Sequence, residues 1–97
     1  MGRGAGGGTA GRAAEMPATP AGWRKAGRTF SAERFGRRVT IGNVGTLSAR
    51  WAQQRFERQD LPGERNALVS QGATSYFDTF REALRSSEGW IDASPLR

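Results

Sequence analysis

The sequence predicts a small, mainly α-helical protein with a disordered N-terminal arm, one short strand and two to three helices. Three observations support this prediction. Gly and Ala dominate the start of the chain, apolar and polar residues alternate over one short stretch that begins at Arg38, and apolar residues recur every three or four positions between Asn66 and Ser87. The predicted divisions are a disordered arm at 1–22, a basic-aromatic segment at 23–38 and a small helical body at 39–97.

The arm has too few large apolar side chains to offset the entropy that a chain loses when it becomes ordered. We therefore expect residues 1–22 to be disordered. The first thirty residues also contain Arg and few acids, which leaves a cleaved organellar transit peptide as an alternative. Their high Gly content argues against the amphipathic helix that such peptides form.

The basic-aromatic segment at 23–38 interleaves rings with cations. Guanidinium groups on phosphates and rings on bases are the usual components of a surface that binds single-stranded nucleic acid. The predicted nucleic-acid-binding residues are Trp23, Arg24, Lys25, Arg28, Phe30, Arg34, Phe35, Arg37 and Arg38. The alternative is that the three rings anchor the segment under the body while the cations stay solvated.

A short stretch of alternating apolar and polar residues begins at Arg38. Val39 and Ile41 would lie on one side of a short strand, and Arg38, Thr40 and Gly42 on the other. A lone strand leaves its backbone groups unpaired, so we expect it to pair with another part of the protein or with a second copy.

A first helix is predicted from Leu47 to Arg58. On a helical projection it has two apolar faces rather than one, because Leu47 and Trp51 lie almost opposite Ala52 and Phe56. A helix with two apolar faces is typical of one held between two bodies. We therefore predict that Leu47 and Trp51 bind a protein partner or a second copy, and that the body completes its core with another chain.

A turn is predicted at Asp60–Glu64, where Pro62 fixes φ and Gly63 follows it, and a second helical region is predicted from Asn66 to Ser87. Gly72 interrupts this region, so the stronger helix is expected at 75–87. The apolar face of the whole region from Asn66 to Ser87 consists of Val69, Ala73, Tyr76, Phe77, Phe80 and Leu84.

The composition argues against an enzyme. The chain contains no Cys and no His, which removes the usual zinc ligand sets and the Ser-His and Cys-His catalytic arrangements. No phosphate-binding loop or dinucleotide motif is present, so we expect no metal and no cofactor. No apolar run is long enough to span a bilayer, and no recognisable secretion signal is present, so the expected location is the cytoplasm, a virion or an organelle matrix.

The charge is uneven along the chain. Residues 1–38 hold eight cations and two acids, whereas residues 39–97 hold seven of each. A neutral body joined to a basic segment favours a polyanionic partner. The leading hypothesis is a non-catalytic protein associated with nucleic acid. The alternatives are a small structural subunit of a large assembly, such as a virion or organellar complex, and a small inhibitor that binds an acidic site on an enzyme.

Overall fold

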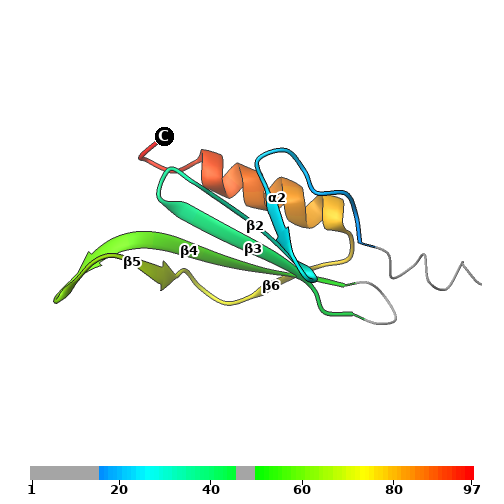
Figure 1. The fold of residues 1–97 in the computed structure, drawn as a ribbon, viewed down its shortest axis with the longest axis horizontal. Helices are drawn as coiled ribbons and strands as arrows, with labels where there is room; N and C mark the ends of the chain where they lie inside the picture. The colour runs from blue at the N-terminus through cyan, green and yellow to red at the C-terminus, as the bar shows by residue number, and fades with distance from the viewer. Residues whose placement is uncertain (1–15, 46–49) are drawn as a thin grey trace, which may run out of the picture.

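The computed structural model of the protein describes residues 16–45 and 50–97. These residues form one antiparallel sheet of six strands with one helix packed on it (Figure 1). The mainly helical prediction is therefore wrong, since the fold is mainly β. The elements are β1 (Arg24–Ala26), β2 (Thr29–Arg34), β3 (Arg37–Asn43), β4 (Trp51–Leu61), β5 (Glu64–Ser70), β6 (Ser75–Phe77) and α2 (Phe80–Asp92).

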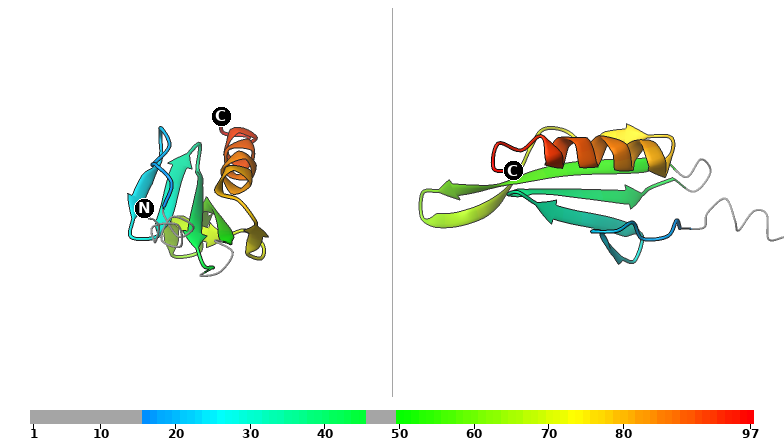
Figure 2. Two further views of the ribbon diagram at one scale, coloured as in Figure 1. Left: turned by 90° about the vertical axis from the view of Figure 1, so that its right-hand side faces the viewer. Right: turned by 90° about the horizontal axis from the view of Figure 1, so that it is seen from above.

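The sheet is a meander in which each strand from β1 to β5 pairs with the next one along the chain. The long strand β4 pairs with β3 on one side. On its other side it pairs with β6 near Trp51 and with β5 beyond Phe56. Helix α2 lies along one face of this sheet, as the two views in Figure 2 show. Residues 23–38 of the predicted basic-aromatic segment thus belong to the same sheet as the rest of the body.

Strand β4 occupies most of the region predicted as the first helix. Alternate residues of β4 face the same side, and Trp51 and Gln53 are buried beneath α2 while Gln54 is exposed. The alternation is hard to see in the sequence because polar Gln53 and Arg55 occupy positions that face the helix. Leu47 lies outside the described residues, so its predicted partner contact has no structural account.

The second helical region also divides differently. Its first part is β5, Gly72 takes a positive φ of 83°, and β6 precedes the helix. Helix α2 begins after Thr79, whose hydroxyl accepts a hydrogen bond from the backbone N–H of Glu82 at 3.1 Å. The spacing of three and four that predicted one helix therefore runs by coincidence across two strands and a helix.

Two local predictions are confirmed. The predicted turn lies between β4 and β5 but is shorter than expected, since only Pro62 and Gly63 stand outside the strands, and Gly63 has a positive φ of 81°. The alternating stretch is strand β3, with Val39 and Ile41 fully buried. Its pairing partners are β2 and β4 of the same chain, so no second copy is needed to satisfy its backbone.

The core fills the space between α2 and the sheet. Three rings meet there: the centroid of Phe80 lies 4.8 Å from that of Phe30 and 5.0 Å from that of Trp51. The expectation of a core completed by another chain is therefore corrected, because the large apolar side chains of β2, β3 and β4 are already buried by α2. The buried apolar residues of this cluster are Trp23, Phe30, Ala32, Val39, Ile41, Trp51, Ala83 and Ile91.

Candidate functional site

The sheet face opposite α2, here called the open face, contains no buried side chain in the described part of the chain. The strand register places its residues in rows that cross the sheet. One row runs Thr29, Gly42, Ala52, Tyr76, and the next runs Ser31, Thr40, Gln54. A third row consists of Glu33, Arg38, Phe56 and Ser70. The open face is thus a mixed polar surface that carries cations and aromatic rings.

A hollow of about 310 Å³ lies on the open face above the first of these rows. Its floor is formed by residues with little or no side chain, Gly42 and Ala52, which are cross-strand neighbours. Tyr76 stands at its side with 58% of its surface exposed, and the guanidinium of Arg50 lies 5.5 Å from the centre of its ring. The remaining lining residues are Thr29, Thr40, Val44, Gln54 and Thr74.

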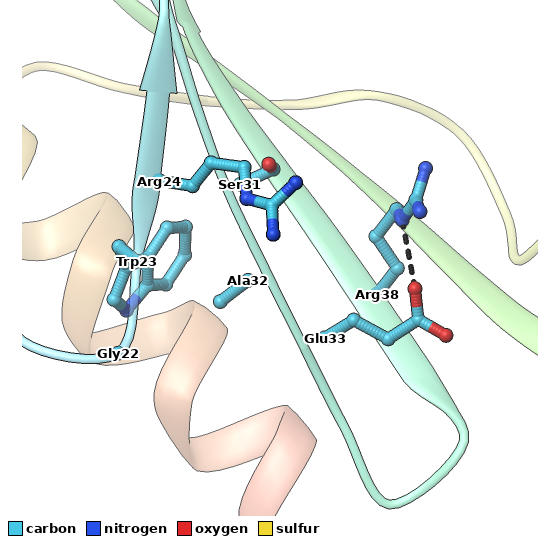
Figure 3. A pocket seen from close by; sticks show the side chains of 7 residues that line it. All are labelled: Gly22, Trp23, Arg24, Ser31, Ala32, Glu33 and Arg38. Carbon is cyan, nitrogen blue, oxygen red and sulfur yellow. Dashed lines mark hydrogen bonds and ion pairs between the residues drawn. The ribbon is translucent and has the colours of Figure 1, made fainter.

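A second hollow of about 300 Å³ lies beside the N-terminal end of β1 (Figure 3). Two guanidinium groups, those of Arg24 and Arg38, project from it, and Ser31 of β2 lies beside Arg24 as its cross-strand neighbour. Among the described residues, no carboxylate lies within ion-pair distance of Arg24. The other lining residues are Gly22, Trp23, Ala32 and Glu33.

Glu33 connects two cations on the open face. Its carboxylate accepts hydrogen bonds from Arg38 Nε at 3.1 Å and from Arg58 Nε at 2.9 Å. The hydrogen bond from Arg58 is the main reason that the pKa of Glu33 lies below its ordinary value; partial desolvation opposes it and Arg38 adds to it. Glu33 is therefore ionised at neutral pH.

The six predicted phosphate-binding cations are divided between the two faces of the sheet and its turns. Arg24 and Arg38 lie on the open face, and exposed Arg28 lies in the β1–β2 turn. The others lie on the side of α2, where Arg34 Nη2 is 3.7 Å from Asp92 and the Lys25 ammonium is 5.9 Å from the Phe30 ring.

Arg37 is held on the helix side of the sheet. Its Nε donates to Glu57 at 3.1 Å, its Nη1 donates to the carbonyl oxygen of Trp90 at 2.7 Å, and its guanidinium lies 4.6 Å from the centre of the Trp90 ring. Through these contacts Arg37 attaches the end of α2 to β3 and β4. The Arg37 guanidinium therefore cannot contact a ligand on the open face.

The three rings predicted to stack on bases do not lie together on one surface. Phe30 is fully buried, and Trp23 is buried with its indole N–H hydrogen-bonded to Glu88. Both rings anchor their segment in the core, so for them the alternative to base stacking is the one observed. Phe35 lies in the β2–β3 turn with φ of 57° and 38% of its surface exposed. Trp51, predicted to bind a partner, is buried against Phe80.

Sequence patterns do not identify Tyr76 and Arg58 as residues of the open face. Tyr76 fits the spacing of a helical core face, and only its pairing with Ala52 places it on the open face. The available signal was the run Ser75–Phe77, in which two adjacent β-favouring aromatics follow Gly72 and precede a helix cap at Thr79.

Comparison of the chain with known proteins does not assign it. Protein-family models, curated proteins and solved structures gave no match. No helix within the described residues is long and apolar enough to cross a membrane. The same residues contain no cluster of three or more acidic side chains suited to hold a metal ion. Any functional assignment therefore depends on the chemistry of the open face.

Proposed function

We propose that the protein binds single-stranded nucleic acid on the open face of its sheet and has no catalytic role. The observation that carries this proposal is the pairing of two accessible guanidinium groups, on Arg24 and Arg38, with an exposed ring, Tyr76, on a sheet face that no described element covers. Cations that contact phosphates and rings that stack on bases are the two components such a surface needs.

The phosphate contacts are assigned to the hollow beside β1. A guanidinium presents a planar set of donors that matches two phosphate oxygens, and the Ser31 hydroxyl beside Arg24 supplies one more donor. The described residues carry thirteen cations and eight acids, so their net charge of +5 also attracts a polyanion over a longer range.

The base contacts are assigned to the hollow beside Tyr76. Its small floor residues allow a flat group to approach the sheet, and a half-exposed ring at the side supplies a stacking surface. Bases in a duplex are already stacked and paired, so this arrangement favours an unpaired strand. Arg50 adds a cation beside the same ring.

The salt dependence of binding to a labelled oligothymidine tests the proposal in the full chain. Each phosphate contact to a single strand contributes about −0.7 to the slope of log affinity against log salt. Replacing Arg24 and Arg38 together with Ala should flatten the slope by about 1.4. The matched control replaces Arg81 and Arg85, two exposed residues of α2, which removes the same charge from the other side of the molecule.

Two results would contradict the proposal. Equal losses from both double variants would indicate general attraction to polyanions rather than a site on the open face. Competition by heparin as effective as that of the oligonucleotide, with no effect of the Arg24 and Arg38 substitutions, would favour an acidic protein surface as the partner.

A further inference from the structure

Glu33 is the one acidic side chain on the open face where β2, β3 and β4 pair, within the described structure. A carboxylate at this place repels the phosphates that the proposed function brings to the face. It also lies in the wall of the hollow that Arg24 and Arg38 share (Figure 3). Its position therefore calls for an explanation beyond general solubility.

The two arginines that Glu33 contacts are engaged to different extents. All three guanidinium nitrogens of Arg58 are used, because Nε and Nη2 donate to Glu33 at 2.9 and 3.3 Å and Nη1 donates to the carbonyl oxygen of Asn66 at 3.1 Å. Arg38 donates to Glu33 through Nε alone. Its two terminal nitrogens have no partner among the described residues and project away from Glu33 (Figure 3).

We propose that Glu33 is a specificity-determining residue of the open face, which withholds Arg58 from the ligand and orients Arg38 toward it. This inference rests on the proposed function. A phosphate that displaced Glu33 from Arg58 would exchange one anion for another and leave the carboxylate beside it with Arg38 as its one remaining partner, so Arg58 adds no net phosphate contact. The face then presents the guanidiniums of Arg24 and Arg38, with Arg58 held back.

The consequence is selectivity between polyanions. Contacts to anionic groups carry no information about the bases, so an additional free guanidinium strengthens binding to any polyanion, and most to the one with the highest charge density. By limiting the number of free guanidiniums, Glu33 leaves a larger share of the binding free energy to base stacking at Tyr76. Heparin has no bases and carries more charge per unit length than a single strand, so it should gain more than an oligonucleotide when Glu33 is neutralised.

The test compares four full-length proteins: wild type, Glu33→Gln, Arg58→Ala and the double variant. Glu33→Gln should steepen the slope of log affinity against log salt for oligothymidine by about 0.7, the value of one additional contact. The double variant should return to the wild-type slope, and Arg58→Ala alone should leave it unchanged. Heparin should compete more effectively with oligothymidine for Glu33→Gln than for wild type.

Glu64→Gln is the matched control, because it removes one exposed acid from β5 that forms no ion pair among the described residues. If it steepens the slope as much as Glu33→Gln, or if the double variant stays as steep as Glu33→Gln, the inference is overturned. An unchanged slope in Glu33→Gln overturns it while leaving the proposed function intact. Absence of salt-dependent binding by wild type overturns both. Should Glu33→Gln fail to fold, Glu33→Thr places a β-favouring residue on the same strand and carries the same expectation.

Discussion

The indole N–H of Trp23 donates a hydrogen bond of 2.8 Å to the carboxylate of Glu88, which lies 65 positions later in the chain. The bond ties the segment before β1 to the middle of α2. Because the Trp23 ring is buried in the core, this contact closes the side of the fold next to the short edge strand β1. It also explains why a tryptophan that looks like a stacking residue in the sequence is placed for stability.

Replacing Trp23 with Phe should keep most of the buried ring and remove the donor. A hydrogen bond to a charged group contributes about 1.5–3 kcal/mol, so we expect a loss of that size in the free energy of unfolding measured with urea. The affinity for oligothymidine should stay at the wild-type value. A variant of normal stability and reduced affinity would show instead that Trp23 contacts the ligand.

Local turn chemistry and one alternating strand were predictable from the sequence, but the sheet was not. Strand β3 was recognisable because Val39 and Ile41 stand out against polar neighbours. Strand β4 was not, because its helix-facing positions include Gln53 and Arg55, whose polar groups bond to each other and to Ser86 and Ser87 of α2, 31 to 34 positions later. The spacing of apolar residues along the chain does not reveal polar contacts between residues that are far apart in the sequence.

The candidate site was predictable only in part. The basic character of residues 24–38 is evident in the sequence, but the register decides which cations share a face. Arg37 and Arg38 are adjacent in β3, so their side chains point to opposite faces of the sheet. Arg37 contacts Trp90 on the helix side, and Arg38 lies on the open face. The aromatic partner of these cations, Tyr76, comes from a strand that follows β5 and could not be placed without the pairing of β6 with β4.

The buried amide of Gln53 should fix the position of α2 on the sheet. Its Nε2 donates to Ser87 Oγ at 2.8 Å, and its Oε1 accepts from Arg55 Nε at 2.9 Å, with only 1% of the residue exposed. Gln53→Leu keeps a similar volume but leaves Arg55 Nε and the Ser87 hydroxyl without the partners that Gln53 supplies, so we expect a loss of about 1–3 kcal/mol in urea unfolding. Gln54→Leu, on the exposed side of the same strand, should change stability by less than about 0.5 kcal/mol. Equal effects would contradict a role for the buried network.

Stability should depend weakly on pH through Glu33. Its pKa is lowered in the folded protein, so its ion pairs stabilise the fold above the ordinary value of 4.5 and the effect is lost as pH falls through the lower, folded value. Because the side chain is one-third exposed, we expect well under 1 kcal/mol. Urea midpoints of wild type and Glu33→Gln, measured from pH 3 to 7, should converge at the acid end. A difference that grows as the pH falls would contradict this assignment.

Filling the hollow beside Tyr76 should weaken binding without weakening the fold. A Cβ on Gly42 would lie 3.5 Å from Thr29 Oγ1, an ordinary contact, and the backbone there does not require glycine. Gly42→Val places a β-favouring side chain in the hollow, so the melting temperature should not fall. The affinity for oligothymidine should fall if the hollow admits a base. Unchanged affinity with a normal melting temperature would move the base contacts elsewhere.

Removing the Tyr76 ring should have the largest effect on affinity for a single strand. Stacking on an aromatic ring contributes about 1–3 kcal/mol per base, so Tyr76→Ala should weaken oligothymidine binding about 5- to 150-fold. Tyr76→Phe, which keeps the ring, should bind as wild type does. The matched control is Phe35→Asn, because Phe35 is the other partly exposed ring predicted to stack, and Asn tolerates its positive φ of 57°. If Phe35→Asn lowers the affinity and Tyr76→Ala does not, the stacking surface lies at the β2–β3 turn rather than on the open face.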